Sequence, residues 1–335
     1  MENLAAGIDE LAFTKNHLAL LMSIQYHSLL KEASLSVSFS KVRKFLMSQE
    51  DKSLKISRYR EKKRCWIKSW LEITKKLLDV ELLSKETIKS EVTKINKKRK
   101  VAFVVEIAIF EPYFKLSETE DSIDVRYDNS DKDSYIKESA RLLNLEDTQF
   151  HQSSKYFNDC AKNIAKTLSG FNWTIPLVGI GAAILLFTAP FLAGSIGGLM
   201  GLTGAAATSA GLAFLGGGSL AAGGLGMTGG YIALMAGGSI LGYATGTKEY
   251  KKRLASTSKE ELLISCSKLF SYLKISNANN LDKSNTCEKA REMQFDFEQN
   301  SDIKYIEGVN AEGESNAIKA ATLGAFRKIL REGEK

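Results

Sequence analysis

The stretch that decides the fold is Trp173-Thr-Ile-Pro-Leu-Val-Gly-Ile-Gly-Ala-Ala-Ile-Leu-Leu-Phe-Thr-Ala-Pro-Phe-Leu192. It lies in an 81-residue segment, residues 167–247, that contains no Asp, Glu, Lys, Arg or His. A helix of about 20 apolar residues crosses the roughly 30 Å hydrocarbon core of a bilayer. Trp173 stands at the edge of the stretch, where an amphipathic ring prefers the membrane interface. The stretch therefore predicts a membrane-spanning helix within what we call the uncharged segment.

The rest of the uncharged segment is rich in glycine. Residues 231–247 form a second, shorter candidate span, with Tyr243 near its exit as another interface anchor. Small residues spaced four apart let membrane helices approach closely and pack. Six glycines at this spacing are the expected helix-packing residues: Gly194, Gly198, Gly226, Gly230, Gly242 and Gly246.

Basic residues flank the uncharged segment at both ends. Positive charge tends to stay on the cytoplasmic side, so both flanks are expected on one side, with an even number of crossings. Two spans fit best, and three would place one basic flank outside. The flanking side chains expected to contact lipid headgroups are Lys162, Lys166, Lys248, Lys251, Lys252 and Arg253. The alternative is a soluble protein that buries the segment as a hairpin between its own helices.

The rest of the chain is charged, and its basic excess is local. The 335 residues carry a formal charge of +7, and residues 41–100 hold 20 Lys/Arg against 8 Asp/Glu. Beside a membrane segment, an anionic bilayer is the simplest partner, because each nearby Lys or Arg contributes ~1 kcal/mol there. The N-terminus has no basic region followed by an apolar one, so no signal peptide is expected. We expect synthesis in the cytoplasm followed by membrane association.

Outside the uncharged segment, apolar residues recur at helical spacing and predict a mainly α-helical fold. The clearest stripe, in steps of three, four and seven, is Tyr59, Trp66, Trp70, Ile73, Leu77 and Val80. Narrow stripes on long charged helices favour an elongated bundle. Other helices are expected at residues 4–31, 40–48, 134–168, 257–275 and 317–331, with a polar loop at 277–285.

Residues 101–110 differ from these helices. They are β-branched and apolar, which predicts either a buried strand or a short core helix, too short to span a bilayer. Ile123, Val125 and Tyr127 alternate with polar residues as a candidate partner strand, so one small β-hairpin is expected.

Five regions follow from these patterns. A basic helical region, an acidic linker or small β element, and a helix leading to the membrane precede the membrane segment. A C-terminal helical region follows it. In chain order, the regions are the basic helical region (residues 1–115), the acidic linker or small β element (116–133), the helix leading to the membrane (134–166), the membrane segment (167–247) and the C-terminal helical region (248–335).

No residues with the spacing of a catalytic, cofactor or metal site stand out. Residues 224–229 match GxGxxG, and Glu249 lies about 20 residues further on, but no β-branched strand precedes the match. Neither a phosphate-binding loop nor a serine-hydrolase elbow occurs. The four cysteines and three histidines form no zinc motif. We therefore expect a non-enzymatic protein without cofactor or metal.

The basic run at residues 55–68, with aromatic residues interleaved, has three interpretations. It is a core stripe with a solvated basic face, a lipid-headgroup surface, or a nucleic-acid surface that binds phosphates and stacks on bases. Because Tyr59, Trp66 and Trp70 share one helical stripe, core packing is favoured and nucleic acid is the weakest interpretation.

Two family resemblances concern the uncharged segment. Residues 201–246 resemble the Gly/Ala-rich membrane hairpins of interferon-inducible glycine-rich membrane proteins. The exit, Gly242-Tyr-Ala-Thr-Gly-Thr-Lys-Glu-Tyr-Lys-Lys-Arg253, resembles the end of the membrane segment in the transmembrane/coiled-coil α/β-hydrolase family. No hydrolase domain follows here, so that activity is not implied. The overall plan is similar to α-helical pore-forming toxins of the cytolysin A type.

Three functional hypotheses follow. The leading one is a helical protein that inserts its hairpin, forms a homo-oligomer and permeabilises or remodels a membrane, as a toxin or defence effector would. The second is a constitutive membrane-anchored scaffold or sensor that recruits a cytoplasmic partner. The third is a soluble helical protein that binds nucleic acid.

Overall fold

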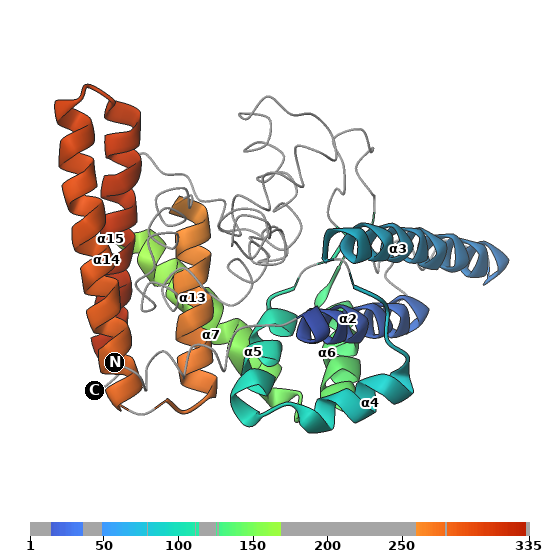
Figure 1. Ribbon diagram of the computed structural model, residues 1–335. Helices are drawn as coiled ribbons and strands as arrows, with labels where there is room; N and C mark the ends of the chain where they lie inside the picture. The colour runs from blue at the N-terminus through green and yellow to red at the C-terminus, as the bar shows by residue number, and fades with distance from the viewer. Residues whose placement is uncertain are drawn as a thin grey trace. The chain divides into compact units, whose positions relative to one another are not determined.

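A computed structural model describes residues 15–35, 49–78, 80–110, 112–113, 125, 127–168, 259–278 and 280–332. These residues are mainly helical (Figure 1), which confirms the prediction of a mainly α-helical fold. The helix expected at 40–48 and the uncharged segment lie outside them, and the elongated bundle stays a prediction. The helices within the described ranges are α2 Lys15–Leu35, α3 Gln49–Leu78, α4 Lys85–Lys94, α5 Lys97–Ala108, α6 Asn129–Leu143, α7 Thr148–Thr167, α13 Lys259–Ile275, α14 Asn280–Ile306 and α15 Asn310–Glu332.

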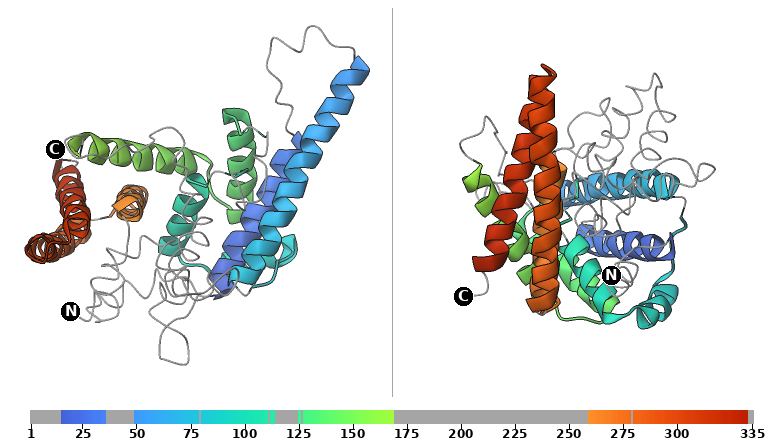
Figure 2. Two further views of the ribbon diagram at one scale, coloured as in Figure 1. Left: turned by 90° about the horizontal axis from the view of Figure 1, so that it is seen from above. Right: turned by 60° about the vertical axis from the view of Figure 1, so that its left-hand side comes forward.

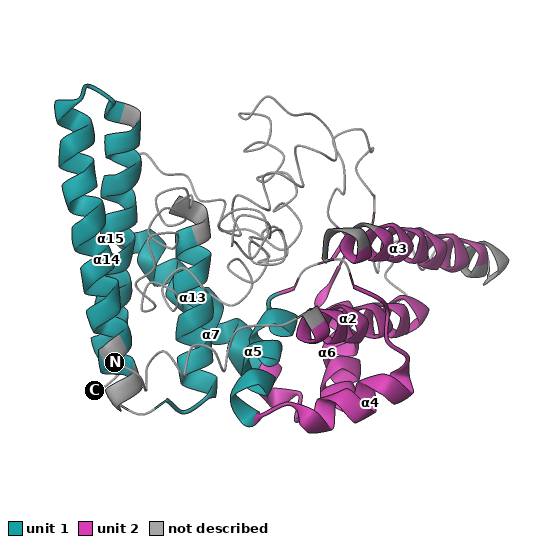
Figure 3. Cartoon of the chain, viewed as in Figure 1, with its two compact units in different colours: residues 1–13, 97–109, 151–335 teal, residues 14–96, 110–150 magenta. Residues whose placement is uncertain are grey.

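The described residues divide into two compact units (Figure 3). Unit 1 contains α5, α13, α14, α15 and the part of α7 from His151 onward. Unit 2 contains α2, α3, α4 and α6, together with the connection that begins at Phe110. The units do not follow chain order, because the chain passes from unit 2 into unit 1 with α5, returns for α6, and enters unit 1 again within α7.

Unit 2 is organised around the aromatic stripe of α3. Figure 2 shows α3 lying beside α2, and α6 also packs on α2. Trp66 and Trp70 are no more than 2% exposed and stack with their ring centroids 6.3 Å apart. Phe110 and Tyr135 extend this aromatic core. The two tryptophans are therefore core, as the spacing of the stripe predicts, and are not available to stack on bases.

A buried cluster of charged groups lies beside the aromatic core. The Lys63 ammonium on α3 donates hydrogen bonds to Glu32 on α2 and, over 2.9 Å, to Asp131 on α6. The Tyr113 hydroxyl donates to the other carboxylate oxygen of Glu32, and Lys63 Nζ lies 4.9 Å from the Tyr113 ring centre. The side chains of Lys63 and Glu32 are completely buried. The cluster links three helices and so specifies how they pack.

Burial raises the pKa of two members of this cluster, Glu32 and Tyr113. It raises the pKa of Glu32 to about 7, against the opposing effect of Lys63. It also raises the pKa of Tyr113 far above its usual range, so the hydroxyl keeps the proton that it donates. The backbone of Tyr113 is left-handed, with φ 69°, which costs roughly 1–2 kcal/mol for a residue with a side chain. Its hydrogen bond to Glu32 and its edge-on contact with Trp66 hold it there.

Residues 101–110 are helical up to Ala108, as part of α5. Of the two structures predicted for this stretch, the core helix is confirmed and the strand is wrong. No strand occurs among the described residues, which include Val125 and Tyr127, so the β-hairpin prediction is wrong for them. Branching at Cβ lowers helix propensity by only a few tenths of a kcal/mol, which burial outweighs. The buried aliphatic side chains of α5 are Val101, Val104, Val105 and Ile107.

The single helix predicted over residues 134–168 is two helices, α6 and α7. Asn144 has a left-handed backbone, φ 53°, and ends α6. The Leu145 N–H then donates to the Ala140 carbonyl oxygen over 3.0 Å. Asparagine tolerates the left-handed conformation better than most residues, so it is a common helix end. The helical spacing continues through this break, which is why periodicity alone did not reveal it.

The acidic stretch at residues 116–133 is helical at its end. Asp128 caps α6 by accepting hydrogen bonds from the backbone N–H groups of Ser130 and Asp131, over 2.9 and 3.0 Å. The Asp131 side chain accepts in return from the Asp128 N–H. Because the same Asp131 oxygen also accepts from Lys63, this residue belongs to the helix cap and to the core. α6 therefore begins at Asn129, inside the region predicted as an acidic linker or small β element.

The C-terminal region contains more helix than predicted. α13 ends at Ile275, as expected, while residues 257 and 258 of the predicted helix lie outside the described residues. The polar loop is shorter than predicted, because α14 begins at Asn280. α15 begins at Asn310, seven residues before the predicted start. α14 and α15 pack together as a long helical hairpin (Figure 1).

Replacing Lys63 by Met should destabilise unit 2 by about 3–5 kcal/mol, because a buried ion pair that loses one partner leaves an uncompensated charge. Urea unfolding can be followed by the fluorescence of Trp66 and Trp70 in a Trp173→Phe background, in which both remaining tryptophans report on unit 2. Its exposed neighbour provides the control: Lys62→Met should change stability by less than about 0.5 kcal/mol. Equal unfolding midpoints for the two variants would contradict the burial of Lys63 against Glu32 and Asp131.

Candidate functional site: the base of the uncharged segment

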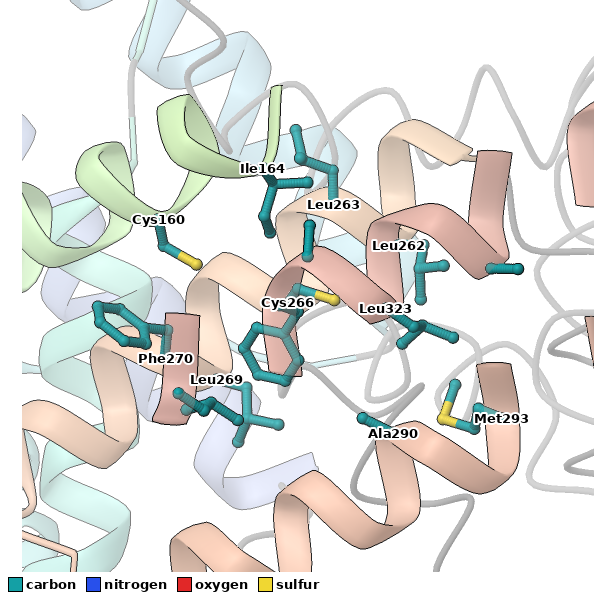
Figure 4. Close-up of a cluster of buried hydrophobic side chains, with 14 of the residues drawn as sticks. Cys160, Ile164, Leu262, Leu263, Cys266, Leu269, Phe270, Ala290, Met293 and Leu323 are labelled. Atoms are coloured by element: carbon teal, nitrogen blue, oxygen red, sulfur yellow. The ribbon is translucent and has the colours of Figure 1, made fainter. Parts of the chain in front are cut away.

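Two helices of unit 1 bracket the uncharged segment. α7 ends at Thr167, and α13 begins at Lys259. Leu168, just after α7, and Leu262 and Leu263, near the start of α13, are at most 2% exposed. All three belong to the hydrophobic cluster that is shown in part in Figure 4. We call α13 and the part of α7 in unit 1 the base of the uncharged segment.

Polar contacts establish that the two helices of the base are antiparallel. The Oγ atoms of Ser153 and Ser271 lie 2.8 Å apart, and Ser271 Oγ is 2.9 Å from the Ser153 carbonyl oxygen, to which it can donate. This contact joins the beginning of α7 to the end of α13. Leu168 follows the end of α7, and Leu262 lies near the start of α13. Both belong to one hydrophobic cluster, at the other end of the helix pair from the serine contact. The chain therefore leaves and re-enters unit 1 at the same end of the helix pair.

Two buried cysteines lie in the base, one on each helix. Cys160 and Cys266 are members of the same cluster (Figure 4) and both are free thiols. Burial raises the pKa of Cys160 to about 12, although a hydrogen bond with Ser267 opposes this. Burial also raises the pKa of Cys266 well above its usual range. Because the thiolate is the reactive form, these cysteines act as small apolar core residues.

A buried ion pair joins the base to α5. The Lys268 ammonium of α13 donates to both carboxylate oxygens of Glu106, over 2.8 and 3.0 Å. Both side chains are only 3% exposed. Burial raises the pKa of Glu106 to about 7, against the attraction of Lys268. The pair fixes α5 against α13, since a different packing would leave a buried charge without its partner.

The chemistry of the base indicates a structural role. Its buried groups are hydroxyls, protonated thiols and one ion pair. Within the described ranges, no group of three or more His, Cys, Asp or Glu side chains could hold a metal ion. What the arrangement does is hold together the two chain ends that lead into the uncharged segment.

The structure places two of the residues predicted to contact lipid. Lys162 and Lys166 are exposed on α7, whereas Cys160 and Ile164 on the same helix are buried. None of the helices in the described ranges is both long and apolar enough to cross a membrane. The remaining predicted site residues lie outside the described residues: Trp173, Gly194, Gly198, Gly226, Gly230, Gly242, Tyr243, Gly246, Lys248, Lys251, Lys252 and Arg253.

Sequence reasoning missed the buried ion pairs of Lys63 and of Glu106, although each residue gave a signal. Lys63 stands on the aromatic stripe of α3, four residues after Tyr59 and three before Trp66, so its position predicted burial. Glu106 interrupts the apolar run at residues 101–110. A charge in an apolar stripe indicates a buried partner. The identity of that partner required the fold.

The Glu106 ion pair gives stability a defined pH dependence. The folded-state pKa of about 7 exceeds the ordinary value of 4.5, so the folded protein binds an extra proton between these pH values. The stabilisation that comes from protonating the buried Glu106 is complete below pH 4.5 and is lost as pH rises through 7. Relative to Glu106→Gln, the free energy of unfolding of the wild-type protein should fall over this window by at most about 3 kcal/mol.

Urea unfolding followed by circular dichroism at a series of pH values measures this difference. A difference that is flat or rises between pH 4.5 and 7 would mean that the attraction of Lys268 outweighs burial and keeps Glu106 ionised.

Thiol labelling tests the packing of the base. With a disulfide reagent at pH 8, Cys65 should react at once because it is exposed, and the half-buried Cys287 should react more slowly. Cys160 and Cys266 should react only after denaturant is added, because they are buried and protonated. The Cys65→Ser variant should lose the fast phase alone. Rapid labelling of Cys160 or Cys266 in the native protein would contradict the packing of α7 on α13.

Comparisons with known proteins do not assign this chain to a family. Its sequence matches no protein-family model, and neither the curated proteins nor the solved structures contain a match to it. The resemblances of the uncharged segment to membrane hairpins therefore stay expectations, and function is argued from the residues and geometry of the chain itself.

Proposed function

We propose that this chain is a helical, non-enzymatic membrane protein. Residues 167–247 insert into a bilayer as a hairpin, associate with the same segment of other copies, and permeabilise or remodel the membrane. The charged helices remain outside the hydrocarbon core and hold the two ends of the hairpin.

The geometry of the base is the observation that carries this proposal. A segment that leaves and returns at one end of a packed helix pair has both of its ends on one side of a membrane. That arrangement requires an even number of crossings, which two spans satisfy. Charge favours the same arrangement, because basic residues flank the segment at both ends.

The core of unit 1 also supports an inserted segment. The cluster around the base draws its buried residues from α7, α13, α14 and α15. These helices therefore bury one another's apolar faces, and in the proposed function the apolar residues of the uncharged segment face lipid. Exposed Lys162 and Lys166 would then lie near the headgroups, and each basic residue contributes ~1 kcal/mol at an anionic surface.

The exposed face of α3 favours a second candidate function, a membrane-anchored scaffold. Trp66 and Trp70 face the core of unit 2, while Arg58, Lys62 and Lys68 are exposed on the same helix. A basic helical surface of this kind attracts acidic partners through long-range electrostatics. In this function the uncharged segment anchors the protein and does not permeabilise the bilayer.

Leakage of a dye from liposomes separates the two candidates. The uncharged segment has no side chain charged at neutral pH to line an ion pathway, so permeation depends on close packing between several copies. Replacing Gly226 and Gly230 by Ile should abolish leakage, because branched side chains push the helix backbones apart. Membrane association should remain, since Ile is more favourable in lipid than Gly. The control Thr203→Ala/Thr208→Ala should leak as the parent does.

The same liposomes show the sidedness of the protein. Protease should reach tags at Met1 and Lys335 equally, because both flanks lie on one side. Parent protein that binds liposomes without leakage would favour the scaffold, and tags on opposite sides would rule out the hairpin. Parent protein that does not bind liposomes would overturn both candidates and favour a buried segment.

A further inference from the structure

The turn between α14 and α15 carries an exposed group of large apolar side chains. Ile306, the last residue of α14, is 86% exposed, which is unusual for isoleucine. The neighbouring side chains of this group are between 37% and 48% exposed. We call the group the hairpin tip, and its members are Ile303, Tyr305, Ile306 and Val309.

The hairpin tip is a well-defined structure. Gly308 has φ 78° and closes α14, with the Val309 N–H donating to the Lys304 carbonyl oxygen over 2.9 Å. Ser301 Oγ donates to the Gly313 carbonyl oxygen over 2.8 Å and is buried. A Cβ atom at Gly313 would lie 3.1 Å from the Tyr305 ring, so this glycine allows the ring to pack on α15. The apolar side chains are therefore presented by a fixed turn.

The hairpin tip lies at the end of unit 1 where the uncharged segment is attached. α14 follows α13 after a short connection and runs back along it, so it passes the start of α13 (Figure 1). Phe297 still belongs to the cluster that contains Leu262. Ile306 is nine residues further along α14, which is about 13 Å at the rise of an α-helix. The tip thus projects beyond the point where the chain leaves α7 and re-enters α13.

The charges around the tip do not attract it to an anionic surface such as the bilayer of the proposed function. Residues 302–314 contain Asp302, Glu307, Glu312 and Glu314 against the single cation Lys304. Lys304 forms ion pairs with Glu307 and Glu312, over 2.9 and 3.4 Å. Any attraction of the tip to a surface must therefore come from its apolar side chains. A bilayer interface accepts such side chains without requiring complementary charge.

We propose that the hairpin tip inserts its apolar side chains into the lipid interface beside the uncharged segment, as a second membrane contact of unit 1. The inference rests on the proposed function, because the segment brings the bilayer to this end of the unit. Apolar side chains that lie beyond the point where the chain leaves α7 and re-enters α13 fit an interface in which apolar groups are buried ~5–10 Å deep. Tyr305 suits the same depth, since its ring is amphipathic.

Fluorescent labels on the full-length chain test this inference. In a Cys65→Ser/Cys287→Ser background, an environment-sensitive dye is attached to one added cysteine: Asn310→Cys at the tip, Leu185→Cys in the uncharged segment, or Glu288→Cys near the start of α14. Vesicles of phosphatidylcholine containing a spin-labelled lipid are then added. We expect quenching at positions 310 and 185 and none at 288. Quenching at 310 should persist in high salt, because apolar contact is not screened.

A pair of substitutions tests which side chains are responsible. Ile303→Ser/Ile306→Ser should lower the ratio of inserted to free tip at least about tenfold, measured at position 310. Quenching at 185 should not change. The matched control is Glu298→Ser/Gln299→Ser, which alters exposed polar residues of the same helix and should leave both signals as in the parent.

The outcomes separate the inference from the proposed function. Quenching at 185 without quenching at 310 would overturn the tip contact and leave the inserted segment. Quenching at 310 without quenching at 185 would keep the tip as a lipid contact and overturn the proposed function. Absence of quenching at both positions would overturn both. A change at 310 that depends on protein concentration without vesicles would overturn lipid as the occupant and indicate a second copy.

Discussion

The packing of α7 against α13 is the contact on which the functional argument depends. Apolar side chains supply most of its stability, since burial contributes roughly 25 cal/mol per Å². The Ser153–Ser271 contact adds only about 1 kcal/mol, but a slipped register would leave buried hydroxyls unpaired at a cost of ~1–3 kcal/mol. Stability therefore comes from the leucines and register from the serines. Together they keep the two ends of the uncharged segment at one end of the helix pair.

The same division of roles recurs in the buried ion pairs. Glu32–Lys63 in unit 2 connects the successive helices α2 and α3, and Glu106–Lys268 in unit 1 connects α5 to α13, 162 residues further along the chain. Removing charges from water offsets much of their attraction, and the pKa of about 7 of both glutamates reflects that balance. Such pairs add little to stability compared with apolar burial. Their effect is to disfavour other packings, in which each charge would be buried alone.

Helical spacing predicted which parts of the chain are helical better than it predicted where each helix begins and ends. Trp66 and Trp70 were assigned to the core because a stripe in steps of three and four is sufficient evidence for a buried helix face. The break at Asn144 was missed, because one left-handed residue does not disturb that spacing. Residues 101–110 stayed ambiguous between strand and helix, since propensity differs by only tenths of a kcal/mol there. Tertiary burial decided in favour of α5.

The candidate site could be predicted only in part, for a similar reason. The basic flank at Lys162 and Lys166 follows from composition, and both side chains are exposed. The antiparallel pairing of α7 with α13 depends on contacts between residues that the whole uncharged segment separates in the sequence. No local pattern encodes such contacts. Glu106 in an apolar run indicated a partner, but nothing in the sequence pointed to Lys268.

The interleaving of the two units imposes an order on the synthesis of the protein. Glu106 precedes its partner Lys268 by 162 residues, so α5 emerges from the ribosome long before α13 exists. At about 5–20 residues per second, translation needs roughly ten to thirty seconds to cover that distance. During this interval α5 exposes an unpaired carboxylate and apolar side chains, and the entire uncharged segment is produced. The most apolar part of the chain is therefore complete before the helix that closes its base exists, and hydrophobic surface exposed in such an interval is prone to aggregation.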